Sequence, residues 1–161
     1  MEEAVILELK RNSAEYSKVV DDIVRIEKKI FPKHESLSTS FDNELRKRNT
    51  GLLYVSHHIN ADIAGYVMYS SPSSLLSFIT KLAVKEKYRR QGYGEALLKA
   101  AISKCQARNI QRISLHVDPS RMPAVSLYQK LGFRIDSTVE KYYSADRDAY
   151  RMYLDLDIDD C

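Results

Sequence analysis

A basic, glycine-rich turn between a strand pattern and a helix pattern restricts the fold of this chain more than any other feature. An apolar run ends near Val84, and the next residues read Lys85-Glu86-Lys87-Tyr88-Arg89-Arg90-Gln91-Gly92-Tyr93-Gly94-Glu95-Ala96. Glycine lets the backbone approach a ligand closely, and the unpaired N–H groups and dipole at a helix start favour an anion. The segment therefore predicts a strand–turn–helix unit that binds a phosphate or pyrophosphate.

Two common phosphate loops are excluded by the residues around these glycines. A Walker loop needs Gly-Lys-Ser/Thr, which is absent, and Leu97 stands where a Rossmann fingerprint has its third glycine. Two further interpretations stay open for the segment taken alone. One is a solvated basic loop in which glycine only serves helix entry, and the other is a nuclear-localisation or nucleic-acid patch, which Glu86 interrupts.

The rest of the chain alternates between strand and helix patterns. A strand over residues 4–9 precedes a helix that Asn12 or Ser13 caps and Phe31-Pro32 ends. The further expected elements are a short helix over 40–49, strands over 52–55, 63–69 and 75–84, a helix over 92–108, a strand over 112–117, a helix over 124–131, and strands over 133–139 and 150–156. Antiparallel strands first and a β-α-β-α-β order later predict an α/β fold with a mixed sheet flanked by helices.

Length and composition predict one globular domain over residues 1–161. The chain is 44% hydrophobic and 29% charged, as ordinary globular proteins are. Its net charge of +3 is too mild to require nucleic acid as a partner. The longest uncharged stretch, residues 63–80, contains Pro72 and five serines. It therefore predicts two strands and a loop, and we expect no membrane partner.

Cysteine usage and the first residues bear on the compartment. Cys105 and Cys161 form neither a disulfide framework nor a metal-ligand cluster, so we expect no metal and a reducing, intracellular environment. Met1-Glu2-Glu3 is acidic where targeting peptides are basic or acid-poor. The expected location is the cytoplasm, and the nucleus is also compatible.

Two segments resemble signatures of the GNAT superfamily of acyl-CoA-dependent N-acetyltransferases. Residues 89–94 resemble its Gln/Arg-x-x-Gly-x-Gly/Ala motif, placed as there between a strand and a long helix. The second segment, similar to Ala-x-x-Leu-Tyr-x-x-x-Gly-Phe, reads Ala124-Val125-Ser126-Leu127-Tyr128-Gln129-Lys130-Leu131-Gly132-Phe133. The resemblance implies a single GNAT-like domain with a mixed, mostly antiparallel sheet. It also implies direct transfer of an acetyl group from acetyl-CoA to an amine, without a metal.

The same resemblance implies roles for individual residues. Tyr128 matches the residue that donates a proton to the departing thiolate, and His116 matches the general base; simple core packing and a strand-edge histidine are the alternatives. His34, His57 and His58 receive no role. The residues implied to bind acetyl-CoA are Leu82, Val84, Arg89, Arg90, Gln91, Gly92, Tyr93, Gly94 and Glu95.

Three features resemble the subgroup that acetylates protein N-termini. They are Phe31-Pro32, Tyr142-Tyr143 between the last two strands, and the closing pattern of residues 148–152. Phe31, Pro32, Tyr142 and Tyr143 are therefore expected to bind a peptide. The chain departs from the subgroup's pattern at Lys33, Glu35, Phe78, which replaces a helper tyrosine, and Arg121, which replaces an asparagine that contacts CoA.

The resemblance favours an N-acetyltransferase acting on the α-amine of protein or peptide N-termini, and leaves an auxiliary subunit open. Two alternatives remain on the same scaffold. One is acetylation of lysine or a small-molecule amine, and the other is an acyl-CoA-binding regulatory module without turnover. His116 and Tyr128 argue against the module.

Overall fold

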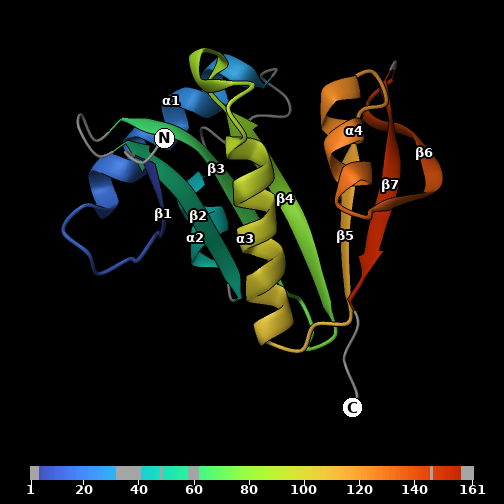
Figure 1. Ribbon diagram of the computed structural model, residues 1–161, viewed down its shortest axis with the longest axis horizontal. Helices are drawn as coiled ribbons and strands as arrows, with labels where there is room; N and C mark the ends of the chain where they lie inside the picture. The colour runs from blue at the N-terminus through green and yellow to red at the C-terminus, as the bar shows by residue number, and fades with distance from the viewer. Residues whose placement is uncertain (1–3, 32–40, 48, 58–61, 146, 157–161) are drawn as a thin grey trace.

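One seven-stranded sheet organises the molecule, in the order β1-β2-β3-β4-β5-β7-β6 (Figure 1). The computed structural model describes residues 4–31, 41–47, 49–57, 62–145 and 147–156. The elements are β1 (Ala4–Glu8), α1 (Tyr16–Ile30), α2 (Phe41–Arg46), β2 (Thr50–His57), β3 (Ile63–Ser70), β4 (Leu76–Val84), the 3-10 helix η1 (Glu86–Tyr88), α3 (Tyr93–Ala107), β5 (Arg112–Val117), α4 (Met122–Lys130), β6 (Arg134–Ser144) and β7 (Arg147–Asp155). Neighbouring strands run antiparallel except β4 and β5, which confirms the mixed, mostly antiparallel sheet expected above.

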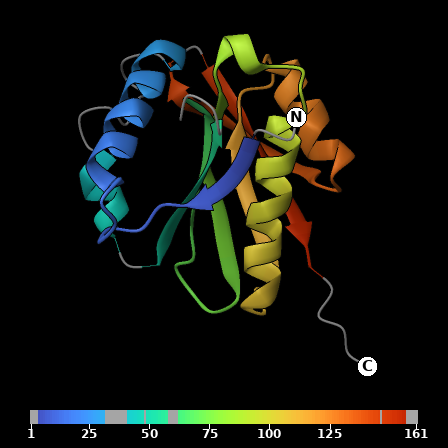
Figure 2. The same cartoon turned by 60° about the vertical axis from the view of Figure 1, so that its left-hand side comes forward.

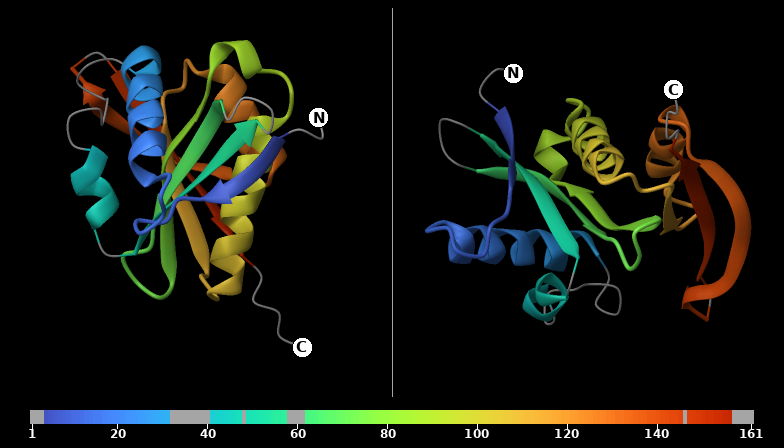
Figure 3. Two further views of the ribbon diagram at one scale, coloured as in Figure 1. Left: turned by 90° about the vertical axis from the view of Figure 1, so that its left-hand side faces the viewer. Right: turned by 90° about the horizontal axis from the view of Figure 1, so that it is seen from below.

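Helices cover both faces of this sheet. α1 and α2 lie on one face, and α3 and α4 lie on the other (Figures 2 and 3). Alternation along the strands separates two cores, since Leu52 and Tyr54 of β2 pack toward α1 and α2 whereas Leu53 and Val55 pack toward α3. In each core, alternate side chains of the strands pack against the apolar faces of the helices, which recur every three or four residues.

Helix α1 shows how local sequence and burial agree. Its side chains at three- and four-residue spacing, Val19, Ile23 and Ile26 among them, are buried against the sheet. The helix begins at Tyr16 with Glu15 at the N-cap and no side-chain cap, so the expected capping by Asn12 or Ser13 is wrong. Phe31 has an extended backbone, as the residue before a proline prefers, and this ends the helix.

The central strands β4 and β5 diverge after a short parallel pairing. Only three residue pairs join them, from Leu76 with Arg112 to Phe78 with Ser114, although β4 continues to Val84. The pairing of β4 with β3 also slips by one residue at Thr80, since Lys81 faces Met68 and Ile79 faces Tyr69. The two strands therefore separate toward the end of β4 that leads into η1 and α3.

The bulge at Thr80 reverses which face each later residue of β4 occupies. Ile79 belongs to the core under α3, and Ala83, four residues on, belongs to the core under α1. In a regular strand these two residues would share a face. Lys81 consequently points toward α1 and Leu82 toward α3.

The C-terminal hairpin is longer than the sequence suggested. Tyr142 and Tyr143 lie inside β6, not between the last two strands, because β6 and β7 stay paired to Ser144 and Arg147. A bulge at Lys141, with φ +56°, absorbs the extra residues, and Asp148 accepts a hydrogen bond from its backbone N–H. Helix α4 likewise starts earlier than expected, at Met122, because Pro123 fits the first turn of a helix.

Within the residues described, no helix combines the length and the apolar character needed to cross a membrane.

Candidate active site

A cavity of about 540 Å³ opens where β4 and β5 separate. It is bounded by the end of α1, by β4 and β5, by α4 and by β6. The lining residues are Phe31, Phe78, Ile79, Thr80, Lys81, Leu82, Leu115, His116, Val117, Asp118, Arg121, Ala124, Tyr128, Tyr142 and Tyr143. The structure thus brings both expected catalytic residues together with three of the four expected peptide-binding residues, and Pro32 lies outside the described residues.

His116 projects into this cavity from β5. Its imidazole stacks on the Tyr142 ring, with centroids 4.3 Å apart and planes 9° from parallel. Burial, reinforced by the positive charge of Arg151, holds the pKa of His116 below its usual value. The ring is therefore neutral at neutral pH and is able to accept a proton.

Tyr128 reaches the same cavity from α4. Its ring is buried and packs edge-on against Phe133, 5.7 Å away, as the apolar spacing of α4 predicts. Burial raises the pKa of Tyr128 to about 12, although the charge of Arg121 works in the opposite direction. The phenol therefore keeps its proton at neutral pH and is able to donate it.

The β6–β7 hairpin forms one wall of the cavity and is tied to the β5–α4 turn. Arg147 donates two hydrogen bonds to Asp118 Oδ2, at 2.9 and 2.7 Å, and its guanidinium also lies 4.8 Å from the centre of the Tyr143 ring. Tyr143 in turn contacts Tyr142 edge-on at 4.8 Å. This chain of contacts runs from Asp118 through Arg147 and Tyr143 to Tyr142, which stacks on His116.

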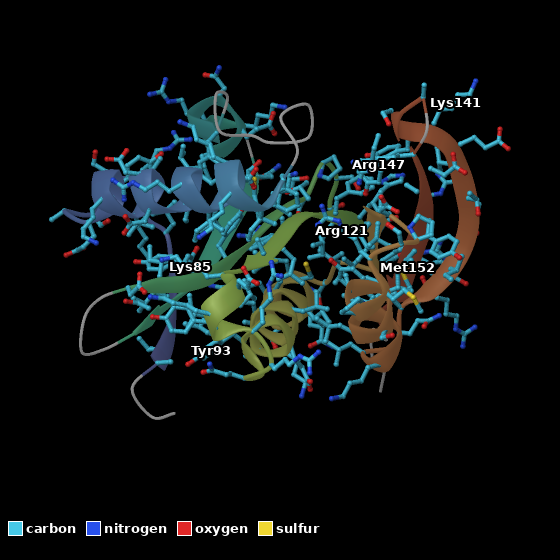
Figure 4. The ribbon with its side chains drawn as sticks, turned by 90° about the horizontal axis from the view of Figure 1, so that it is seen from above. Lys85, Tyr93, Arg121, Lys141, Arg147 and Met152 are labelled. Atoms are coloured by element: carbon cyan, nitrogen blue, oxygen red, sulfur yellow. The ribbon has the colours of Figure 1, made fainter. Side chains whose placement is uncertain are left out.

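The glycine-rich turn lies at the far end of β4, at the start of α3, outside the residues that line the cavity (Figure 4 labels Lys85 and Tyr93 there). Gly92 forms the N-cap of α3 with φ +87°, and Arg90 is also left-handed with φ +64°. A Cβ on Gly92 would meet no atom within 4 Å, so the space beside this backbone is open. The first N–H groups of α3 have no partner inside the helix.

The carboxylate of Asp62 binds two residues at the start of this turn. Asp62, just before β3, accepts hydrogen bonds from Lys85 Nζ at 2.7 Å and from the Tyr88 hydroxyl at 2.6 Å. These bonds hold the pKa of the Asp62 carboxyl far below its usual range, against the opposing effect of burial. Arg89 adds a bond from Nε to the Val84 carbonyl at 2.9 Å. These bonds hold Lys85 and Tyr88 to Asp62 and hold Arg89 to the end of β4.

Residues 20–133 match the Acetyltransferase (GNAT) family, a span that includes the glycine-rich turn and the Ala124–Phe133 segment. The match covers more than half of the chain. The chain belongs to the GNAT acetyltransferase family.

Individual relatives agree with this assignment. A protein named N-alpha-acetyltransferase from Sulfurisphaera tokodaii is 32% identical over 149 residues, which cover 85% of this chain and 87% of that protein. The "N-terminal acetyltransferase A complex catalytic subunit NAA10" of Arabidopsis thaliana is 36% identical over 110 residues, covering 65% of this chain and 57% of the relative. The crystal structure of the ribosomal-protein-S18-alanine N-acetyltransferase from Escherichia coli shares the fold, with a TM-score of 0.82, 22% identity and coverage of 98% and 96% of the two chains.

GNAT enzymes use acetyl-CoA, and the residues of this GNAT chain fit it. The open side of Gly92 and the unpaired N–H groups after it suit a pyrophosphate. Leu82 connects this turn to the cavity along β4. Glu95 would contribute through its backbone alone, because its carboxylate pairs with Lys99 at 3.0 Å and with Lys130 at 2.9 Å. Val84 and residues 89–95 would therefore hold the phosphates, and Leu82 would lie nearer the acetyl end.

Two cationic residues that line the cavity were not predicted from the sequence as site residues. Lys81 lines the cavity with its ammonium 3.7 Å from the centre of the Phe31 ring, and burial lowers the pKa of this lysine. A charged residue between Thr80 and Leu82 in an apolar strand was the available signal. Arg121, noted in the sequence only as a departure, also faces the Phe31 ring, at 5.1 Å.

Proposed function

We propose that this enzyme transfers the acetyl group of acetyl-CoA to the α-amine of protein or peptide N-termini. The observation that carries the proposal is the pairing of a neutral imidazole and a protonated phenol across one cavity. His116 on β5 and Tyr128 on α4 both line the cavity that opens where β4 and β5 separate. The names of the relatives from Sulfurisphaera tokodaii and Arabidopsis thaliana support the choice of an α-amine.

The two side chains share the proton transfers of the reaction. Acetyl-CoA, when bound, supplies an acyl group that is already activated as a thioester. His116 removes a proton from the incoming ammonium and passes it to solvent, which frees the nitrogen lone pair to form the new C–N bond. Tyr128 gives its proton to the sulfur as the C–S bond breaks. The nitrogen loses a second proton as the amide forms, and this proton returns to the Tyr128 phenolate through His116 and solvent, so that one proton is released overall. The atoms and charges balance without a metal or a redox partner.

The walls of the cavity support a peptide as the acceptor. Phe31 lies on one side, and Tyr142 and Tyr143 lie on the other. Aromatic walls with hydroxyl groups surround an extended backbone and offer it hydrogen bonds, and they exclude water from the reacting amine. Such a wall favours a short-reach α-amine over a long lysine side chain.

A peptide panel tests the proposal. Turnover is measured by release of free CoA with peptides that carry a free α-amine, with the same peptides blocked at the α-amine, and with blocked peptides that contain lysine. Turnover that requires the free α-amine supports the proposal. Turnover on the blocked lysine peptides alone, or acetyl-CoA binding without turnover on any amine, contradicts it.

We also propose that an auxiliary subunit joins this chain, which the name of the Arabidopsis thaliana relative as the catalytic subunit of a complex supports. Native mass measurement of the tagged chain purified from its own cells tests this. A stoichiometric second protein supports the subunit, and a mass equal to one chain contradicts it.

A further inference from the structure

Two cations flank a single aromatic ring at the end of the cavity formed by α1. The Lys81 ammonium lies 3.7 Å from the centre of the Phe31 ring, and the Arg121 guanidinium lies 5.1 Å from it. Lys81 lies in the bulged part of β4. Arg121 is the residue just before α4, on the far side of the cavity from β4. Figure 4 shows Arg121 between β4 and the C-terminal hairpin.

Among the described lining residues, little negative charge lies near Arg121. Asp118 is the one carboxylate among the described lining residues, and its Oδ2 is occupied by Arg147 at 2.7 Å. Glu27 of α1 is fully buried, accepts a hydrogen bond from the Tyr66 hydroxyl and acts electrostatically on Lys81. Glu27 itself is not part of the lining.

Among the described lining residues, Arg121 is the cation that is available to bind a carboxylate of the acceptor. Its guanidinium has no carboxylate within ion-pair distance anywhere in the described part of the chain, and its ring contact with Phe31 holds it at the cavity wall. Near His116, the positive charge of Arg151 is paired with Asp136 at 3.4 Å. Among the described lining residues, Arg121 is therefore the cation at the Phe31 end with which a carboxylate of the acceptor could pair.

We infer that this acceptor site selects N-termini whose first or second residue is Asp or Glu, with Arg121 as the specificity-determining residue and Lys81 adding to its field. The inference rests on the proposed function, since it names the substrate class of the same site. A carboxylate next to the reacting amine would accept hydrogen bonds from a guanidinium that packing already holds in place. Partial exclusion of water strengthens that attraction relative to bulk solution.

Matched peptide pairs and matched variants test this inference. Peptides that differ only as Glu against Gln, at the first or at the second residue, isolate the charge. The wild-type chain should show kcat/KM about tenfold higher for the Glu peptide of at least one pair, the size expected for one charge-assisted hydrogen bond. Raising the ionic strength should reduce this ratio.

Substitutions at Arg121 then separate charge from packing. Arg121→Gln should bring the Glu/Gln ratio close to one, and Arg121→Lys should keep part of the preference. Arg134→Gln is the control, because it removes the same charge from an exposed position of β6 outside the cavity and should leave the ratio unchanged.

Three results would overturn the inference. The first is equal kcat/KM for Glu and Gln peptides in the wild-type chain. The second is an unchanged preference in Arg121→Gln. The third is a rise in the KM for acetyl-CoA in Arg121→Gln that lowers kcat/KM equally for all peptides, which would assign Arg121 to the cofactor. Absence of turnover on every free α-amine would instead contradict the proposed function itself.

Discussion

The imidazole of His116 and the phenol of Tyr128 have pKa values displaced in opposite directions by their surroundings. Burial lowers the pKa of His116 and raises the pKa of Tyr128 to about 12. Burial disfavours the charged form of each group, so the base stays neutral and the acid stays protonated. The same physical effect thus prepares one residue to accept a proton and the other to donate one.

Replacing His116 with alanine should lower kcat by about 10²-fold or more, the usual contribution of a general base. The Kd for acetyl-CoA should stay nearly unchanged, because His116 lies in the cavity and the expected phosphate contacts lie at the start of α3. Steady-state kinetics and calorimetry check the two quantities. An unchanged kcat would contradict the role of His116.

The pH profile should follow the environment of His116. A general base acts in its deprotonated form, so kcat/KM falls as the pH drops through its pKa, which burial and Arg151 keep below the usual value. Arg151→Gln should raise that pKa and move the acidic limb of the profile to higher pH. Arg134→Gln removes the same charge from a residue that does not act on the pKa of His116, so it should not move this limb. A limb that stays in place in Arg151→Gln would contradict this assignment.

Tyr128→Phe should separate proton donation from packing. The ring contact with Phe133 remains, and the hydroxyl makes no hydrogen bond to any described residue, so the free energy of unfolding should change by less than about 1 kcal/mol. We expect kcat to fall by about 10²-fold at unchanged acetyl-CoA affinity. Tyr153→Phe, on β7 outside the cavity, is the matched control. Wild-type kcat in Tyr128→Phe would leave the tyrosine only a packing role.

At the scale of elements, the junction of β4 with α3 separates the two tasks of the site. The bulge at Thr80 turns Lys81 toward α1, while the end of β4 leads into a turn that Asp62 anchors through Lys85 and Tyr88. The same strand therefore carries Lys81 into the cavity at its middle and leads into the proposed phosphate site at its end.

Gly92→Glu should abolish acetyl-CoA binding. The added carboxylate would project into the open space beside the turn and repel a pyrophosphate there. Gly92→Ala is the control, since it introduces the strain of a positive φ, about 1–2 kcal/mol, without charge or steric overlap and should retain binding. Calorimetric titration with acetyl-CoA distinguishes them. Tight binding by Gly92→Glu would show that the phosphates lie elsewhere.

At the scale of the whole molecule, two parts of one sheet meet at a narrow junction. Within the sheet, β1 to β4 pair with the unit of β5, β7 and β6 through three residue pairs between β4 and β5. The proposed base and acid, His116 and Tyr128, come from β5 and the adjoining α4, whereas Phe31 and Lys81 come from the end of α1 and from β4 (Figure 1). The cavity therefore depends on how the two parts are held together.

Asp118→Asn should loosen the wall formed by the β6–β7 hairpin. It removes the charge that pairs with Arg147 across the β5–α4 turn, and it keeps Oδ1 as acceptor for the Ser120 N–H. We expect the KM for peptide to rise by about tenfold at unchanged acetyl-CoA affinity. Asp155→Asn, which breaks an exposed pair with Arg112, should change neither. An unaltered peptide KM in Asp118→Asn would show that the hairpin keeps its place without this pair.

Much of the fold and part of the site are encoded locally. The spacing of apolar residues in the sequence predicted the helices and strands correctly, apart from the capping of α1, the start of α4 and the length of the last hairpin. The glycine-rich turn and the Ala124–Phe133 segment were enough to predict the GNAT family. Such motifs can be recognised in a sequence because the conformation of a turn and the face of a short helix depend on nearby residues. Tyr128 lies in the second of these segments and His116 in the expected strand over 112–117, and the structure places both in one cavity.

The tertiary structure alone decided what surrounds them. The separation of β4 from β5, the bulge at Thr80 and the position of Tyr142 within β6 depend on pairing between strands far apart in the chain. The contacts of Lys81 and Arg121 with the Phe31 ring join the bulged part of β4, the residue before α4 and the end of α1, which are far apart in the chain. Local sequence shows which residues a chain carries to a site, but the register between distant strands sets their distances, and those distances determine which substrate the site accepts.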